Sequence, residues 1–170
     1  MTAPQLGLIV REFQPGDEEA FRTLNEEWIT RYFVLEEKDS ASLRDPHGKI
    51  LDRGGRIFFA VRGNRAVGCC ALVPMGAGEF EVAKMAVTES ARGGGIGRKV
   101  LERVVAEARA TGARRLYLET NHVLETAVHL YESVGFRHVP KERIIPSPYA
   151  RADVYMELWL GGPEDPPTRS

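Results

Sequence analysis

The sequence predicts a mixed α/β fold in which helices are layered on a sheet. Its 170 residues, 43% of them hydrophobic and 28% charged, are typical of a soluble globular protein that buries a sizeable core. Hairpin-like strands come first, and a strand–helix–strand–helix segment follows, which favours a sheet flanked by helices. We expect one domain over residues 1–160 and a proline-rich, disordered tail over 161–170.

The first half of the chain carries mostly strand signals. Gly63-Asn64 between two β-like runs is typical of a hairpin turn. In the predicted strand over 79–87, side chains alternate between the two faces. One face therefore carries Glu79, Glu81, Ala83, Met85 and Val87. The predicted elements are a strand over 8–13, a helix over 17–33, a loop or short helices over 36–52, and strands over 56–62, 66–75 and 79–87.

The second half changes to a helical period at Ile96. An apolar stripe runs from Ile96 to Ala108, and Gly112 is well placed to end that helix. The remaining predicted elements are a strand over 116–120, a helix over 124–134 stopped at Gly135, and strands over 136–139 and 154–160.

Charge and cysteine usage exclude several classes of protein. A formal net charge of -1 argues against a nucleic-acid binder that depends on a global positive field, although it leaves local basic patches open, and no apolar run approaches the roughly 18 residues that span a membrane. The N-terminus has no secretory pattern. Adjacent strand residues point to opposite faces, so Cys69 and Cys70 form no disulfide, and metal-ligand spacing is absent. We expect a cytoplasmic protein without a metal, nucleic-acid or membrane partner.

The stretch SARGGGIGRKV, residues 90–100, places four glycines within five positions at the start of the predicted helix. Helix N-termini leave backbone N–H groups unpaired, and glycines let these groups converge on an anion. Arg92 and Arg98 add charged donors. The pattern indicates a pyrophosphate site, and a glycine-rich surface turn is the alternative.

Two phosphate-binding motifs fit this stretch poorly. A P-loop needs a Lys-Ser or Lys-Thr pair after the glycines, and none is present. The dinucleotide fingerprint fits Gly93 and Gly95, but its last glycine position holds Arg98. Glu119 lies at about the spacing of a ribose-binding acid, which keeps a nicotinamide ligand open as a weaker alternative.

A third motif fits fully. Residues 92–97 match R-x-x-G-x-G, and EVAKMAVTESARGGGIGRKVLE together with AVHLYESVGF resembles the GCN5-related N-acetyltransferase (GNAT) family. The resemblance extends more loosely from Leu8 to Leu160. It implies a mixed, mostly antiparallel sheet flanked by helices, and acetyl-CoA as the co-substrate. It also allows a homodimer, which no sequence signal decides.

The resemblance implies roles for the residues that match its motifs. The Val87 N–H would stabilise the developing oxyanion, and Tyr131 would act as the general acid toward the sulfur, although a packed core tyrosine is the alternative. The family's usual asparagine seven residues before the tyrosine is Leu124 here. The implied coenzyme contacts are Met85, Ala86, Val87, Arg92, Gly93, Gly94, Gly95, Gly97, Arg98, Asn121 and Tyr131.

The base and the acceptor site are less sharply defined. Glu81 matches the base of the histone-modifying branch, with Glu79 on the same face, and both also fit solvated strand-end carboxylates. Asn121 fits a strand-end cap equally well. The residues placed where the family binds its acceptor are Trp28, Tyr32, Glu79 and Tyr149.

We therefore expect an acetyl-CoA-dependent N-acetyltransferase. It would acetylate a primary amine of a small molecule, amino acid or peptide by direct attack in a ternary complex. A non-catalytic acyl-CoA sensor is the alternative, because a sensor needs the glycine loop but neither acid nor base.

Overall fold

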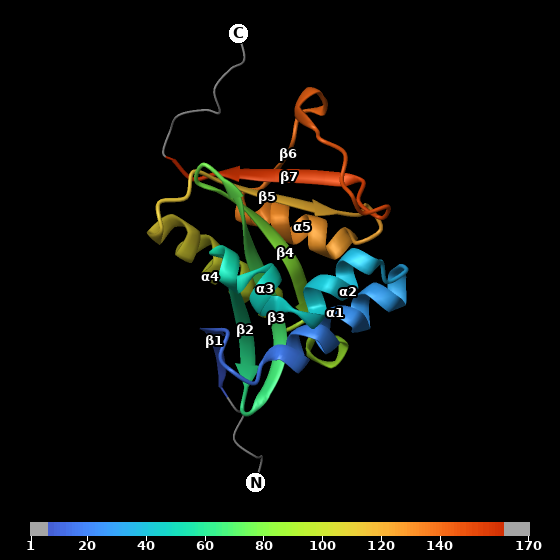
Figure 1. Cartoon of the computed structure of the whole chain (residues 1–170), viewed down its shortest axis with the longest axis vertical. Coiled ribbons are helices and arrows are strands. Elements are labelled where there is room, and N and C mark those ends of the chain that lie inside the picture. The colour runs from blue at the N-terminus through green and yellow to red at the C-terminus, as the bar shows by residue number, and fades with distance from the viewer. Residues whose placement is uncertain (1–6, 162–170) are drawn as a thin grey trace.

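The structure is a computed structural model that describes residues 7–161, so the predicted disordered tail lies outside it apart from Gly161. Seven strands form one sheet in the order β1-β2-β3-β4-β5-β7-β6 (Figure 1). Neighbouring strands are antiparallel except for β4 and β5, which confirms the mixed fold expected from the sequence. The strands are β1 (Leu8–Glu12), β2 (Arg56–Arg62), β3 (Arg65–Gly76), β4 (Glu79–Val87), β5 (Arg115–Thr120), β6 (Arg137–His138) and β7 (Val154–Trp159).

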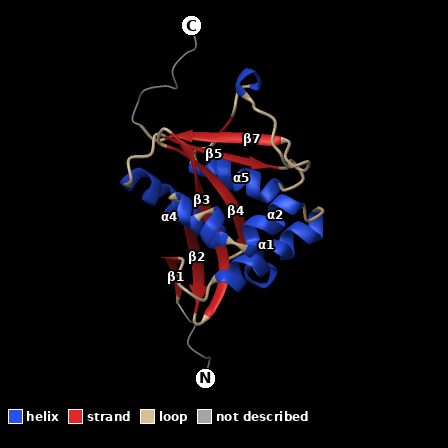
Figure 2. Cartoon of the chain, in the orientation of Figure 1, coloured by secondary structure: helices blue, strands red, loops and turns tan. Residues whose placement is uncertain are grey.

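Helices cover both faces of this sheet (Figure 2). The longer ones pack against it through apolar side chains, α1 and α2 on one face and α4 and α5 on the other. Cys69 is buried on the α1 side and Cys70 on the α4 side, as their adjacency in a strand predicted. The helices are α1 (Glu18–Tyr32), α2 (Glu37–Arg44), α3 (Pro46–Lys49), α4 (Ile96–Ala110) and α5 (Glu125–Val134), with 3-10 turns η1 (Leu51–Arg53), η2 (Glu89–Ala91) and η3 (Lys141–Arg143).

Helix α4 follows the apolar stripe that predicted it. Its buried side chains include Ile96, Leu101 and Ala108, and Gly112 takes the left-handed conformation, φ +79°, just beyond its end. The strand predicted over 136–139 is shorter, because the ladder with β7 covers Arg137 and His138, and Val139 adds a single hydrogen bond to Tyr155.

A bulge in β4 overturns the expectation that Met85 and Val87 share a face with Glu81. Between two matched pairs, Cys69↔Ala86 and Ala71↔Ala83, β4 carries one residue more than β3. Lys84 takes the left-handed conformation there, with φ +54°. The extra residue reverses the alternation, so Met85 and Val87 pack toward the α4 side while Ala86 packs toward α1.

β4 and β5 separate along their length. Their parallel pairing covers three registers and ends at Glu81↔Tyr117. Beyond this point β4 stays paired with β3 and β5 with β7, and the two strands diverge (Figure 1). A split therefore opens in the middle of the sheet, between residues 82–87 and 118–120.

Candidate active site

Two carboxyl groups lie where the split begins. Val82 and Leu118 are buried on the α4 side, so strand alternation directs Glu81 and Glu119 to the α1 side. Burial, the charge of Glu119 and a hydrogen bond with it raise the pKa of Glu81 to about 7, and Lys84 partly offsets this rise. A carboxyl group with this pKa can accept a proton near neutral pH.

The Val87 amide faces the split. Thr88 N donates to Val67 O of β3 at 2.9 Å, and consecutive amides in a strand point to opposite edges. The carbonyl oxygen of Val87 points the same way and accepts a bond from Arg92 Nε at 3.2 Å. The same alternation gives Met85 a split-facing amide, whereas the Ala86 amide points to β3.

The glycine loop joins the end of β4 to α4. Gly93 and Gly95 take φ values of +87° and +75°, which L side chains rarely adopt. A Cβ at Gly97 would lie 3.2 Å from Leu130 Cδ2, so this glycine lets α4 begin close against α5. The first turn of α4 leaves amides without intrahelical partners, a geometry that suits a phosphate.

The two arginines of the loop differ in their contacts. Arg92 is exposed, and its side chain makes only the bond to the Val87 carbonyl among the described residues. Arg98 donates from Nη2 to Ser133 Oγ of α5 at 2.5 Å and lies 3.6 Å from Glu102. Arg92 is therefore the freer of the two for a ligand phosphate.

Tyr131 of α5 lies on the opposite side of the sheet from the carboxyl pair. Its ring packs on Phe136 with centroids 5.9 Å apart, within the core beneath α4 and α5. Burial, with a smaller effect from Cys70, raises the pKa of Tyr131, so its hydroxyl keeps its proton at neutral pH. Within residues 7–161 this hydroxyl makes no hydrogen bond, and no fully buried side-chain polar atom lacks a partner, so the hydroxyl keeps some contact with solvent although the residue is only 7% exposed.

Other predicted site residues are committed to contacts within the protein. Glu79 forms an ion pair with Arg115 at 3.3 Å, at the end of β4 away from the split. Asn121 Nδ2 donates to Arg151 O at 2.6 Å, and its Oδ1 accepts from Val123 N. These contacts favour Glu81 over Glu79 as the base and favour the strand-end cap for Asn121.

Two of the four predicted acceptor residues, Trp28 and Tyr149, lie around Arg151. The Arg151 guanidinium lies 4.7 Å from the Tyr149 ring centroid and 5.8 Å from that of Trp28. It also pairs with the buried carboxylate of Asp39. Tyr32, by contrast, is 43% exposed at the end of α1, so the structure brings Trp28 and Tyr149 together but leaves Tyr32 at the rim.

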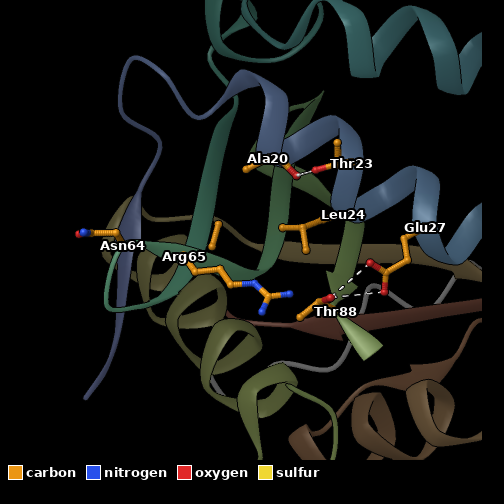
Figure 3. A pocket seen from close by; sticks show the side chains of 8 residues that line it. Ala20, Thr23, Leu24, Glu27, Asn64, Arg65 and Thr88 are labelled. Atoms are coloured by element: carbon orange, nitrogen blue, oxygen red, sulfur yellow. Dashed lines mark hydrogen bonds between the residues drawn. The ribbon is translucent and has the colours of Figure 1, made fainter. Parts of the chain in front are cut away.

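A separate cavity of about 360 Å³ lies between α1, the β2–β3 turn and the end of β4 (Figure 3). It does not include the carboxyl pair or the glycine loop. At its edge Glu27 accepts hydrogen bonds from Thr88 Oγ1 and from Glu89 N, the latter at 2.9 Å. These bonds tie the end of β4 to α1 and so fix the start of the segment that leads to the glycines.

Four residues of this site were not foreseen in these positions. The spacing of Glu119 in the sequence indicates only a ribose ligand. Glutamates at alternate positions of two neighbouring strands could have indicated the carboxyl pair, because they point to the same face of the sheet. Lys84, Asp39 and Arg151 come from distant segments and carry no local motif. Within the described range no cluster of side chains could hold a metal ion, and none of the described helices is long and apolar enough to cross a membrane.

Comparison with known families shows to which family the chain belongs. The family model described as "Acetyltransferase (GNAT) family" matches residues 18–136, more than half of the chain. The chain belongs to the GNAT family. The matched range includes β4, the glycine loop and α5, so both GNAT motifs identified in the sequence fall inside it.

Individual GNAT relatives match parts of the chain. An IAA acetyltransferase from Azospirillum brasilense is 44% identical over 82 residues, which cover 48% of this chain and 54% of that protein. A mycothiol acetyltransferase from Cellulomonas flavigena is 34% identical over 149 residues, covering 79% of this chain and 42% of that protein. The chain thus spans about half the length of the curated relatives it matches.

Solved GNAT structures share the fold at low sequence identity. An acetyltransferase from Staphylococcus aureus has a TM-score of 0.82 at 19% identity and covers 91% of this chain and 99% of its own. A Salmonella typhimurium protein solved with its cofactor acetyl-CoA has a TM-score of 0.74 at 16% identity and covers 95% and 99%.

Proposed function

We propose that this protein is an acetyl-CoA-dependent N-acetyltransferase acting on a primary amine of a small molecule, amino acid or peptide by direct attack in a ternary complex. The observation that carries the proposal is the split between β4 and β5, which has a carboxyl pair at its apex and the glycine loop at its mouth. Family membership supports the same chemistry.

The chain's own groups fit the coenzyme. The split-facing amides of Met85 and Val87 can pair with the pantetheine arm as an added strand would. Gly93 and Gly95 hold the loop in a left-handed conformation, and a Cβ at either position would meet no atom within 4 Å, so their amides remain approachable. Together with Arg92 they would hold the pyrophosphate.

Glu81 would take the proton that the acceptor amine must lose. Alkyl amines are mostly protonated at neutral pH, so attack on the thioester needs a base, either directly or through water. Glu119 shares that proton through its hydrogen bond with Glu81. The amine lone pair then forms the new C–N bond while the proton rests on the carboxyl pair.

Val87 and Tyr131 would stabilise the two negative charges that develop during the reaction, one on the carbonyl oxygen and one on the sulfur. The Val87 N–H donates to the carbonyl oxygen as negative charge grows there, a contribution of roughly 3–4 kcal/mol in comparable oxyanion holes. The C–S bond breaks with its electron pair on sulfur, and Tyr131 donates its hydroxyl proton there. The base and the acid lie on opposite faces of the sheet, which keeps the two proton transfers apart.

Two assays test this proposal with the full chain. Thermal shift with acetyl-CoA, coenzyme A and NAD tests the donor, and stabilisation by acetyl-CoA but not by NAD is expected. Release of free thiol is then measured across a panel of amines, amino acids and peptides. Absence of stabilisation by acetyl-CoA would refute the proposal, and binding without thiol release for any amine would favour the non-catalytic sensor.

A further inference from the structure

Asp39 of α2 is a fully buried carboxylate shared by two cations from distant parts of the chain. Its Oδ1 accepts hydrogen bonds from Lys84 Nζ at 3.0 Å and from Arg151 Nη2 at 2.6 Å, and its Oδ2 accepts from Arg151 Nη1 at 2.7 Å. Burial by itself would raise the pKa of Asp39, but hydrogen bonds from Arg151 and the charge of Lys84 lower it to about 2. The three groups form an ion triad in which Asp39 stays a carboxylate throughout the neutral pH range.

Each cation of the triad belongs to a different half of the proposed site. Lys84 is the bulge residue of β4, and its φ of +54° is a conformation that a lysine keeps only when its surroundings hold it. Arg151 ends the loop that carries Tyr149 and stacks on that ring. Asp39 is thus the common partner of the bulge that precedes Met85 and of the loop at the acceptor side.

The bulge has a direct consequence for the coenzyme. Met85 and Val87, whose amides face the split, follow Lys84 with only Ala86 between them. The extra residue of the bulge determines which edge of β4 these amides face. A change in the backbone at Lys84 would therefore turn the amides that pair with the pantetheine arm. The glycine loop lies beyond Thr88, which is anchored separately through Glu27, so it would not share that change.

We infer that Asp39 is a positioning residue for acetyl transfer, holding the β4 bulge through Lys84 and the acceptor loop through Arg151 in one fixed arrangement. This inference rests on the proposed function. Asp39 acts only through its two partners. A role in stability alone would not require the carboxylate, because buried ion pairs are commonly neutral for stability compared with apolar residues.

The first test compares two ligands by isothermal titration calorimetry. Acetyl-CoA probes the pantetheine contacts, and adenosine 3′-phosphate 5′-diphosphate probes the glycine loop without them. In Asp39→Asn, and also in Lys84→Met, we expect acetyl-CoA to bind at least tenfold more weakly and the fragment to change less than twofold. Equal losses for both ligands, or no loss for either, would overturn the inference.

Glu36→Gln is the matched control. Glu36 contacts Arg151 at 3.4 Å and lies at the start of the same helix, yet it makes no contact with Lys84. We expect both ligands to bind this variant within twofold of the wild type. If Asp39→Asn does not fold, as judged by circular dichroism, Lys84→Met carries the test because it leaves Asp39 paired with Arg151.

A pH profile separates positioning from general loosening. Glu119 of β5 and Lys84 act on the pKa of Glu81, and Tyr117 of β5 and Tyr149 of the loop before β7 in turn feel the charge of Glu81. Lys84→Met removes the cation that lowers the pKa of Glu81, so the acid limb of kcat/KM should move to higher pH. Asp39→Asn leaves Lys84 without a counter-ion, so that limb should move to lower pH.

The outcomes distinguish this inference from the function on which it rests. If the acid limb of kcat/KM moves in the same direction in Lys84→Met and Asp39→Asn, or moves in neither variant, the positioning role is overturned. A wild-type protein that binds acetyl-CoA and releases thiol, alongside variants that behave identically, refutes the inference alone. A wild-type protein that binds no acetyl-CoA refutes the proposed function and the inference with it.

Discussion

Replacing Glu81 by glutamine tests the carboxyl pair through stability as well as activity. The pKa of Glu81 rises from an ordinary 4.5 to about 7 in the folded chain. One pKa unit corresponds to about 1.36 kcal/mol, so ionising this buried group costs the native state on the order of 3 kcal/mol. The native state holds the proton more tightly than the unfolded chain, so wild-type stability should fall as pH rises between these two values.

Glutamine removes this cost because it keeps the shape and carries no charge. We expect Glu81→Gln to gain on the order of 3 kcal/mol in free energy of unfolding, relative to the wild type, between about pH 4.5 and about pH 8. Urea unfolding at a series of pH values measures the difference. Glu79→Gln is the matched control: it loses an ion pair with Arg115 and should show no such gain.

Turnover should change in the opposite direction from stability. Loss of a general base typically costs about 10²–10⁴-fold, and the wild-type rate should fall as pH drops through about 7 because Glu81 becomes protonated. Free-thiol release with a responsive amine measures both effects. Wild-type turnover in the variant would refute the assignment of Glu81 as the base. A stability difference that stays constant with pH would refute the raised pKa of Glu81.

Three further outcomes are expected. In steady-state kinetics, Gly95→Asp should raise the KM for acetyl-CoA by at least about tenfold, because aspartate strains the positive φ and repels phosphate. Gly112 has a similar φ at the other end of α4, so Gly112→Asp should leave that KM unchanged. Tyr131→Phe should lower kcat about tenfold and leave the acetyl-CoA Kd unchanged by calorimetry, and an unchanged kcat would return Tyr131 to a packing role. Burial raises the pKa of Cys69 to about 12 and that of Cys70 further. Neither thiol should therefore react with a thiol reagent in the native protein at about pH 8, and rapid labelling would contradict their burial.

Local sequence patterns predicted most of the elements and the glycine loop that precedes α4. The apolar stripe of α4, the Gly63-Asn64 turn and the glycines that end α4 and α5 each act over a few residues, so their effect is visible in the chain itself. The same holds for the proposed phosphate loop at residues 92–97, where the glycines and the helix that follows would bind the anion together. These parts of the fold need no knowledge of distant contacts.

The bulge at Lys84 could not be predicted in this way. Period-two alternation in β4 gives no sign of an extra residue, and the lysine takes its left-handed conformation in contact with Asp39, which lies 45 residues earlier. The pKa of Glu81 depends on Glu119 of another strand in the same manner. Such features come from tertiary contacts, and they are the ones that give the proposed site its chemistry.

The split itself explains why a coenzyme with amide groups suits this sheet. Beyond Glu81 and Tyr117, β4 and β5 each keep one paired edge and leave the other edge facing the gap. An open ladder edge inside a fold is costly, because unpaired backbone groups away from water lose their hydrogen bonds. A pantetheine arm carries amides that can pair with such an edge, so binding would complete the sheet beyond the point where the carboxyl pair lies.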